Sequence, residues 1–219
     1  MRATARTFLV AALALGLALP SIGYANTKAG EALVKQGTIG GAPCMQCHGA
    51  NGEGQAAAGY PRLAGQSKAY LMKQLQDFKS GQRHDPLMNV FAQALKEQQI
   101  SDVAEYYASL PGWQPSKQAW STLPTSPAPP TSLGLALVQQ GNWDKGIPAC
   151  FACHGEKGAG IFPFFPALAG QHKTYLLKQL TAWQSGARAN DPQGLMKAVA
   201  QKMSPAEMTA VSTYLESLQ

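Results

Sequence analysis

Cys44-Met45-Gln46-Cys47-His48-Gly49 recurs in the second half of the chain as Cys150-Phe151-Ala152-Cys153-His154-Gly155. The chain has 219 residues and four cysteines, so the two C-x-x-C-H motifs contain all of its cysteines. The sequence around the motif is repeated too. The other matching segments are Gly30–Gly37 with Gly134–Gly141, Pro61–Gln66 with Pro166–Gln171, Tyr70–Leu75 with Tyr175–Leu180, and Ser80-Gly81 with Ser185-Gly186. A period of roughly one hundred residues indicates two copies of one domain and not a solenoid.

C-x-x-C followed directly by His is the attachment pattern of c-type haem, in which the two thiols add to the haem vinyl groups. A thioredoxin-like pair would accompany a βαβ pattern, and a zinc site would have its C-x-x-C pairs about 15–20 residues apart. Structural disulfides would not require His after both pairs. The motifs therefore predict two covalently bound haem c groups. The attaching residues are Cys44, Cys47, Cys150 and Cys153, and the proximal iron ligands are His48 and His154.

A six-coordinate haem iron needs a second ligand, and the repeat separates the candidates. Met88 and Met196 match each other, whereas the other methionines after the initiator match different apolar residues, as core positions do. Those pairs are Met45 with Phe151, Met72 with Leu177, Leu95 with Met203, and Ile100 with Met208. We expect Met88 and Met196 to be the distal ligands, with a repeated core methionine as the alternative. His84 and His172 match Ala189 and Ser67, so we expect both on the solvent side.

Two further repeated positions are candidates for supporting the haem ligands. Pro61 and Pro166 precede a repeated x-Leu-Ala-Gly segment, and their carbonyls could accept the Nδ1–H of the proximal histidines. The alternative is a simple turn. Tyr70 and Tyr175 lie on a helix face that we expect to line the haem, with core packing as the alternative.

The first 25 residues have the pattern of an export signal. Arg2 and Arg6 precede an apolar run of twelve residues, Phe8 to Leu19, and small residues follow around Ala25. A membrane-spanning helix needs about 20 residues, so this run is too short to span a bilayer. Residues 1–25 are thus expected to be a signal peptide for export to the bacterial periplasm, with an uncleaved anchor as the alternative.

The rest of the chain divides into two helical domains. Residues 111–131 hold six of the fifteen prolines and predict a stiff, extended linker between domains at 26–110 and 132–219. In the first domain we expect a short helix near Gly30–Gln36, a middle helix that stops at Gly81, and a last helix carrying Ile100. In the second, Ser204-Pro205-Ala206-Glu207 is a capping box with Pro at the first helical position. No strand pattern competes, so the predicted class is all-α.

The charge of the mature chain is modest. Without the two signal-peptide arginines, 16 basic and 12 acidic residues leave a net charge of +4. Lys and Arg are scattered through both halves and form no stripe of the kind that nucleic acid requires. We therefore expect no nucleic-acid partner.

The combination of repeated Cys-x-x-Cys-His-Gly, Pro-x-Leu-x-Gly-Gln and Tyr-Leu-x-x-Gln-Leu with a Pro-rich linker resembles the cytochrome c4 family. The resemblance covers essentially the whole mature chain. It implies two tandem class I cytochrome c domains, related by a pseudo-twofold axis, each with a His/Met haem. It also implies a loosely membrane-associated periplasmic electron carrier. One departure is Lys96, which stands where the second copy has the capping Ser204.

These features predict an electron-transfer protein and not an enzyme. It would carry single electrons between respiratory-chain components, from a quinol-cytochrome c reductase or a dehydrogenase to a terminal oxidase. The alternative is a dihaem subunit of a periplasmic dehydrogenase, like the cytochrome partner of a flavocytochrome. A dihaem peroxidase or a gas sensor would need an open iron, which filled sixth positions disfavour. The loop Ile161-Phe162-Pro163-Phe164-Phe165 is more aromatic than its counterpart Gln55-Ala56-Ala57-Ala58-Gly59-Tyr60, which predicts a higher potential for the second haem.

Overall fold

The computed structural model describes residues 25–38, 41–112 and 132–218. The expected signal peptide and most of the expected linker lie outside these residues, apart from Ala25, Pro111 and Gly112. Each half of the molecule is a bundle of helices, and the described part contains no strand, only isolated bridges within loops. The predicted all-α class is confirmed.

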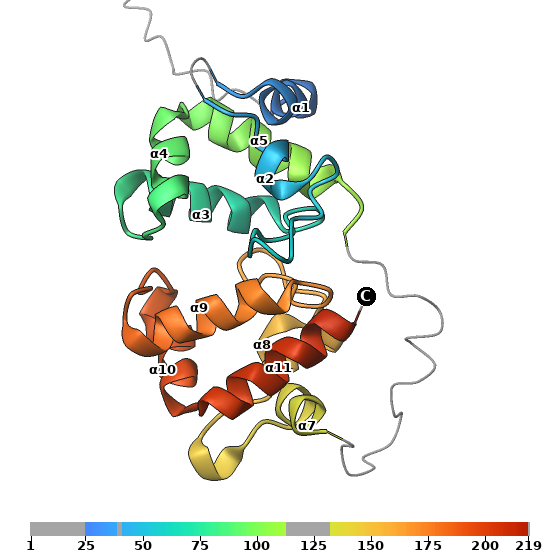
Figure 1. Ribbon diagram of the computed structural model, residues 1–219, viewed down its shortest axis with the longest axis vertical. Coiled ribbons are helices and arrows are strands. Elements are labelled where there is room, and N and C mark those ends of the chain that lie inside the picture. Colours follow the sequence, from blue (N-terminus) through green and yellow to red (C-terminus); the bar gives the residue numbers. More distant parts are fainter. Residues whose placement is uncertain (1–24, 39–40, 113–131, 219) are drawn as a thin grey trace, which may run out of the picture.

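The same order of helices occurs in both halves (Figure 1). The N-terminal half contains α1 (Thr27–Gln36), α2 (Met45–His48), α3 (Lys68–Ser80), α4 (Pro86–Ala94) and α5 (Glu97–Ser109). The C-terminal half contains α7 (Leu133–Gln139), α8 (Cys150–His154), α9 (Lys173–Ser185), α10 (Leu195–Lys202) and α11 (Pro205–Ser217), with 3₁₀ turns at Trp143–Lys145, Glu156–Gly158 and Pro192–Gly194. None of the described helices is both long and apolar enough to cross a membrane.

Local sequence explains where the helices begin and end. α3 and α9 stop at Gly81 and Gly186, both in the left-handed conformation with φ of 80°, which glycine adopts without strain. α11 has the predicted capping box: Ser204 Oγ accepts from the Glu207 amide at 3.3 Å, and Glu207 Oε2 accepts from the Ser204 amide at 2.7 Å. At α5 the side chain of Gln99 accepts from the Lys96 amide, but Lys96 supplies no side-chain acceptor in return.

A repeated glycine lets the first and last helices of each half cross closely. A Cβ atom on Gly30 of α1 would lie 2.1 Å from the backbone oxygen of Asp102 in α5. A Cβ atom on Gly134 of α7 would lie 2.4 Å from the backbone oxygen of Ala210 in α11. Only glycine fits at these crossings, which fix the frame on which the other helices pack.

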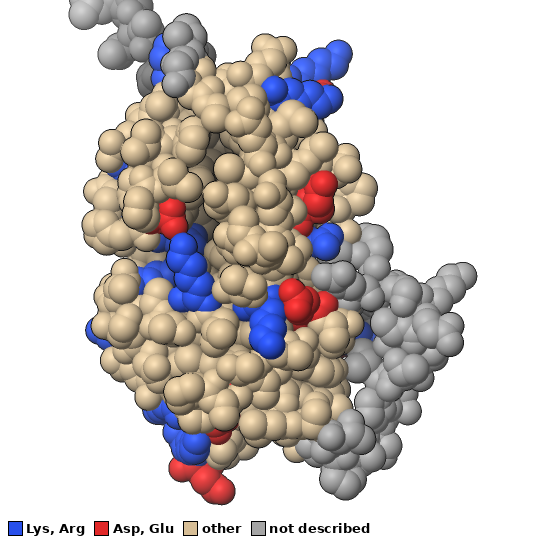
Figure 2. All heavy atoms as spheres, in the orientation of Figure 1, with Lys and Arg blue, Asp and Glu red and all other residues tan. Residues whose placement is uncertain are grey.

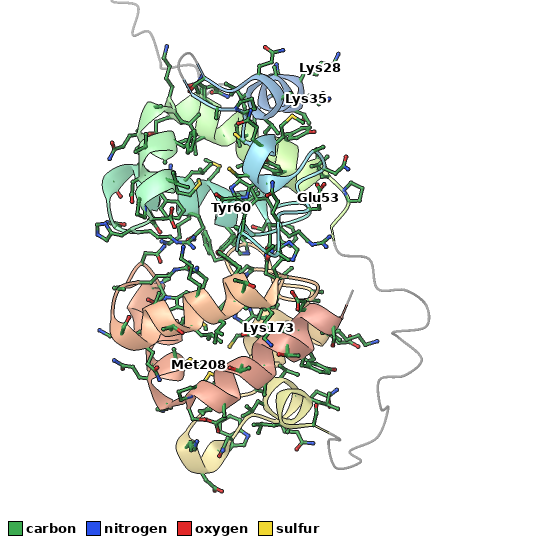
Figure 3. All side chains as sticks on the ribbon, viewed as in Figure 1. Lys28, Lys35, Glu53, Tyr60, Lys173 and Met208 are labelled. Carbon is green, nitrogen blue, oxygen red and sulfur yellow. The ribbon has the colours of Figure 1, made fainter. Side chains whose placement is uncertain are left out.

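Each half has its own apolar core. The methionines assigned to the core by the repeat lie there, with Met203 and Met208 buried in the C-terminal half. Their matching residues Leu95 and Ile100 are buried in the N-terminal half. Met208 is labelled on α11 in Figure 3.

The two halves meet along α3 and α9, which face each other across their boundary (Figure 1). Next to these helices, one glutamine from each half bonds to the backbone of the other half. The Gln66 side chain donates to the Ala167 carbonyl at 2.8 Å and accepts from the Ala167 amide at 3.0 Å. The Gln171 side chain makes the same two bonds to the backbone of Arg62, at 3.0 and 2.9 Å. The reciprocity of these repeated glutamines is that of an approximate twofold arrangement.

Charged side chains on the visible face lie in small, separate groups (Figure 2). Several of the Lys and Arg groups there lie beside Asp or Glu. Figure 3 labels one charged residue on each side of the boundary, Glu53 in the N-terminal half and Lys173 in the C-terminal half.

Candidate functional site

The two C-x-x-C-H motifs form the short helices α2 and α8. The cysteines are unpaired, and each motif ends in a buried histidine, with 7% of His48 and 6% of His154 exposed. A glycine with positive φ follows each histidine, Gly49 at 82° and Gly155 at 79°, and turns the chain away at once. Each motif thus presents two thiols and one imidazole from a single helical turn.

Backbone carbonyls fix the orientation of both imidazoles. His48 Nδ1 lies 3.1 Å from the carbonyl oxygen of Pro61, and His154 Nδ1 lies 2.9 Å from that of Pro166. The carbonyl can only accept, so Nδ1 carries the proton and Nε2 has a free lone pair. Burial lowers the pKa of both histidines, which favours the neutral form that binds a metal. This geometry suits an axial ligand whose ring is oriented by a hydrogen bond behind it.

The thiols do not have the environment of a redox pair. Burial raises the pKa of Cys44, and it raises that of Cys150 to about 11. Reactive C-x-x-C pairs instead depend on a lowered thiol pKa. Among the described residues, no three His, Cys, Asp or Glu side chains form a group that could hold a metal ion directly. The motif residues therefore fit covalent haem better than a thiol redox centre or a zinc site.

Met88 and Met196 lie in corresponding helices, α4 and α10, and both are partly buried. α4 is capped by Asp85, whose Oδ1 accepts from the amides of Leu87 at 3.1 Å and Met88 at 3.2 Å. Met196 packs against the C-terminal core. Their role as distal ligands stays a prediction.

The segment before Met196 is longer than the one before Met88. Relative to the N-terminal copy it contains the additional residues Asn190, Gln193 and Gly194. Gln193 and Gly194 adopt positive φ values of 58° and 68° and form the turn that enters α10. The two candidate ligands are therefore supported by different loops.

Tyr70 and Tyr175 lie at the boundary between the halves, where they contact two buried arginines. Tyr175 Oη accepts from Arg83 at 3.0 Å. Burial raises the pKa of Tyr70, whereas Arg83 and Arg188 lower that of Tyr175 despite its burial. The expectation that these tyrosines line a haem stays a prediction.

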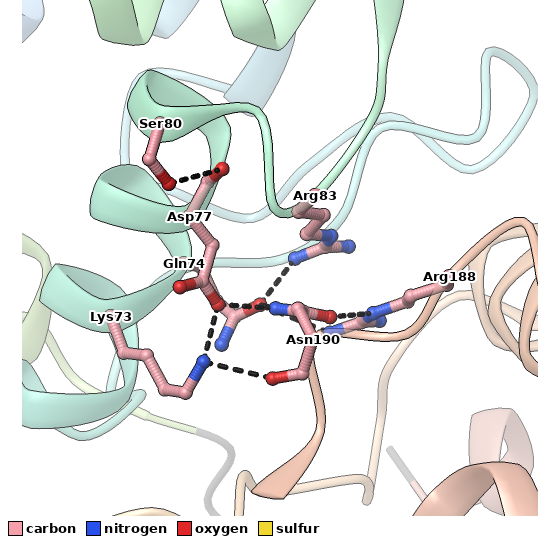
Figure 4. A network of polar contacts seen from close by, with 7 residues as sticks. All are labelled: Lys73, Gln74, Asp77, Ser80, Arg83, Arg188 and Asn190. Atoms are coloured by element: carbon pink, nitrogen blue, oxygen red, sulfur yellow. Dashed lines mark hydrogen bonds and ion pairs between the residues drawn. The ribbon is translucent and has the colours of Figure 1, made fainter. Parts of the chain in front are cut away.

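Sequence reasoning missed the polar cluster between α3 and α9. Gln74 Oε1 accepts from Arg83 at 2.8 Å and from Arg188 at 3.0 Å, and Gln179 Oε1 accepts from the same two arginines at 2.8 and 2.7 Å. Each guanidinium also lies over a ring of its own half, Arg83 on Phe78 and Arg188 on Trp183. Figure 4 shows Gln74, Arg83 and Arg188 of this cluster. The glutamines and arginines are repeated in both copies, and that repetition was the available signal.

The cluster carries more positive than negative charge. Arg83 and Arg188 are 6% and 5% exposed, and their acceptors here are neutral amides and a phenol. The buried carboxylate nearby, Asp77, is paired with Lys73. Buried charges are normally compensated, so this surplus suits anionic groups at the boundary. The propionate groups of a haem are carboxylates, so the chemistry of these two arginines fits them.

One histidine differs from the expectation. His84 is exposed as expected. His172, also expected on the solvent side, is 8% exposed and donates from Nε2 to the Glu53 carbonyl of the other half at 2.9 Å. That expectation was wrong because the segment that begins α9 is covered by the N-terminal half.

The aromatic loop 161–165 is largely exposed in this structure. Phe162 is 77% exposed and Phe164 is 55% exposed. Phe165 meets the His154 ring edge-on, with ring centroids 6.1 Å apart, and Tyr60 lies tilted beside the His48 ring at 6.3 Å. An aromatic ring thus lies beside the histidine in both halves, and the expected difference in potential stays a prediction.

Comparison with protein families and curated proteins finds one consistent group of relatives. The family model described as cytochrome c matches residues 28–111 and 144–219. The chain is 43% identical to the thiosulfate dehydrogenase electron acceptor of Thiomonas intermedia, over 80% of this chain and 77% of that protein. It is 36% identical to cytochrome c4 of Pseudomonas aeruginosa, over 96% of this chain and 98% of that protein.

Solved structures agree with these matches. Reduced cytochrome c4 from Pseudomonas stutzeri superposes with a TM-score of 0.74 at 33% identity, over 90% of this chain and all of that one (100%). The thiosulfate dehydrogenase TsdBA of Marichromatium purpuratum gives a TM-score of 0.78 at 36% identity, over 89% of this chain. The match spans only 40% of the TsdBA chain.

Proposed function

We propose an electron donor and an electron acceptor for this chain, which belongs to the cytochrome c family and has cytochromes c4 among its relatives over nearly its full length. It is an electron-transfer protein with two covalently bound haem c groups in two tandem domains, as its relatives indicate. Our proposal is that it accepts single electrons in the periplasm from a dehydrogenase that oxidises thiosulfate and delivers them toward a terminal oxidase.

The donor is suggested by the balance of similarity. Two proteins described as thiosulfate dehydrogenase electron acceptors are 43% and 42% identical to this chain, whereas the cytochromes c4 are 35–36% identical. In TsdBA, a segment similar to this chain is part of a single longer chain described as a thiosulfate dehydrogenase. Two proteins can be joined in one chain in this way if the carrier accepts electrons directly from the dehydrogenase. The proposed donor depends on this observation.

The proposed site uses the same residue types in each half. Bound haem supplies one-electron chemistry at its iron. In the N-terminal half, Cys44 and Cys47 would attach it, and His48 and Met88 would hold its iron. The corresponding residues of the C-terminal half are Cys150, Cys153, His154 and Met196. An iron held by both a histidine and a methionine would have no position open to a substrate, as expected of a carrier.

Pro61 and Pro166 keep the candidate histidine ligands in a fixed orientation. The carbonyls of Pro61 and Pro166 hold the rings in one tautomer and orientation, so that Nε2 is presented in a fixed direction. A fixed ligand set that does not rearrange on reduction lowers the reorganisation that accompanies electron transfer. We place the protein in the periplasm because residues 1–25 have the features of an export signal.

The donor can be tested by mixing the oxidised holoprotein with purified thiosulfate dehydrogenase and thiosulfate, and following haem reduction by stopped-flow absorbance. We expect rapid reduction that requires both the dehydrogenase and thiosulfate. A quinol-cytochrome c reductase with quinol is the matched second donor. Reduction by the reductase alone would contradict the proposed donor.

The same pair of proteins distinguishes a diffusible carrier from a fixed subunit. A carrier should elute separately from the dehydrogenase in size-exclusion chromatography at micromolar concentration, because redox encounters bury small interfaces. Co-elution as a stable complex would instead favour the alternative of a dehydrogenase subunit.

A further inference from the structure

The two segments that carry the candidate distal ligands are held in different ways. In the N-terminal half, Asn89 holds the segment from within that half. Its amide group donates to the carbonyls of Phe78 at 2.6 Å and Arg83 at 2.9 Å, and its Oδ1 accepts from the Asp85 amide at 2.8 Å. Asn89 follows Met88 directly, so these bonds bind the ligand segment to the end of its own α3.

The C-terminal half lacks this support. The residue after Met196 is Lys197, whose backbone amide donates to Asp191 at 3.0 Å but whose side chain has no amide group to repeat the Asn89 contacts. Instead, the inserted Asn190 bonds across the boundary. Its Nδ2 donates to Asp77 Oδ2 and, at 3.1 Å, to Gln74 Oε1, both on α3 of the N-terminal half.

A lysine of the N-terminal half completes the contact. Lys73 pairs with Asp77 and donates to the Asn190 carbonyl at 2.9 Å, so that Asn190 is bound through both its side chain and its backbone (Figure 4). Within its own half, Asn190 Oδ1 accepts from Arg188 Nε at 2.9 Å. Asp77 is buried, and its match in the C-terminal half is Ala182, so this cluster has no counterpart there.

The contact in the opposite direction is weaker. Lys178 matches Lys73 in the repeat and reaches Asp85 of the N-terminal half at 3.1 Å, but 64% of its side chain is exposed. Exposed ion pairs contribute little to stability, whereas removing one partner of a buried, charge-assisted hydrogen bond is costly.

We propose that the N-terminal half positions the Met196 segment of the C-terminal half through Asp77, Lys73 and Gln74, whereas the Met88 segment is positioned from within its own half by Asn89. These are positioning residues, and the inference rests on the ligand assignment made above and not on the identity of the donor. Its consequence is that a substitution in one half changes the iron of the other.

The test follows binding of cyanide to the ferric holoprotein, since cyanide must displace the distal methionine. Met88→His and Met196→His assign the two binding phases to their haems. In Asp77→Ala, which introduces the alanine found at position 182, we expect about a tenfold or greater increase in cyanide association at the C-terminal haem. The phase of the N-terminal haem, in the half that carries the substitution, should be unchanged.

Of the matched variants, two should affect cyanide association at the N-terminal haem, and one should affect neither haem. Asn89→Ala should increase cyanide association at the N-terminal haem alone. Lys178→Gln should increase it there by at most about fivefold. Lys68→Gln, which breaks an ion pair with Glu105 within the N-terminal half, should leave both phases unchanged. Asp77→Asn keeps an oxygen that can accept from Asn190, so cyanide association at the C-terminal haem should stay nearly as slow as in the unchanged protein.

A second variant separates positioning from general instability. Asn190→Ala removes the bond to Asp77 from the other side, together with the bonds of its side chain to Gln74 and Arg188. The double variant with Asp77→Ala should therefore be no faster than Asn190→Ala alone. Additive effects, or an Asp77→Ala effect on the N-terminal haem, would overturn the proposal. If neither methionine variant shifts a phase, the ligand assignment fails and the proposal fails with it, whatever the result with the dehydrogenase.

Discussion

The imidazoles of His48 and His154 have the same partner in both halves, a proline carbonyl twelve or thirteen residues further along the chain. The prediction of this contact needed only the repeated Pro-x-Leu-Ala-Gly segment and the chemistry of a metal-binding histidine. At the scale of single residues, the cysteines and histidines were therefore accessible from the sequence, because their spacing is fixed by the covalent chemistry of one helical turn.

Attachment of each haem by its own pair of cysteines predicts the intact mass of cysteine variants. Cys44→Ala with Cys47→Ala should yield a protein whose intact mass exceeds that of its mature chain by one haem, whereas the unchanged protein exceeds it by two. The matched control is the pair Cys150→Ala and Cys153→Ala, with the same mass gain from the other haem. Retention of two haem masses in either double variant would exclude the assignment.

The glycine at the crossing of α1 and α5 gives a prediction in stability. Gly30→Ala places a Cβ atom 2.1 Å from the Asp102 backbone oxygen, so the helices must move apart. We expect a loss of about 1–3 kcal/mol in the free energy of unfolding, measured by urea denaturation of the holoprotein. Lys28→Ala, at an exposed position of the same helix, should change it by less than about 0.5 kcal/mol. Equal stability of the Gly30→Ala variant would show that the crossing is not tight.

At the scale of elements, the helix α11 has a pH-dependent start. The Ser204 amide and the Lys145 ammonium group lower the pKa of Glu207 from its usual value of 4.5. A carboxylate with a lowered pKa stabilises the fold above its unfolded pKa, and this contribution is lost as pH falls through the folded value.

Glu207→Gln keeps the capping geometry but removes the charge. The unchanged protein should therefore be more stable than the variant at pH 7, and the difference should shrink as pH falls below about 4.5. Urea denaturation of both proteins between pH 7 and pH 3 measures this difference. A difference that is constant over this range would show that the ionised carboxylate contributes nothing to the cap.

The aromatic loop of the C-terminal half gives a prediction in potential. Phe162 is 77% exposed, and its ring has no part in the buried core of the C-terminal half. Phe162→Ala should leave both midpoint potentials unchanged in a redox titration, within the error of the measurement. A fall in the higher potential would restore the argument that an apolar loop disfavours the extra charge of the oxidised iron.

Most helix limits followed from local chemistry, since Gly81 and Ser204 stop and start helices by backbone conformation and capping alone. The contacts between helices did not. The tight crossing at Gly30 depends on how two helices of one half pack. The burial of His172 and the Arg83–Arg188 cluster depend on how the two halves meet. No local pattern records either. A comparison of the two copies could have indicated the arginines, because Arg83 and Arg188 match each other and apolar packing does not require them.

At the scale of the whole molecule, the two copies keep the same cysteines, histidines and candidate methionines but differ in what surrounds them. Lys73, Asp77 and Asn190 make one boundary contact that has no twofold mate. A duplicated domain can therefore hold two similar sites in unequal surroundings, and a carrier with two similar but unequal haems can accept and deliver electrons at different sites.

The measurement that bears most directly on this account is the proton NMR spectrum of the fully reduced holoprotein. A methionine bound to ferrous haem gives a methyl resonance shifted strongly upfield by the haem ring. We predict two such resonances, of which Met88→Ala removes one and Met196→Ala removes the other. One resonance or none in the unchanged protein, or two that persist in either variant, would contradict the assignment of one His/Met site to each half.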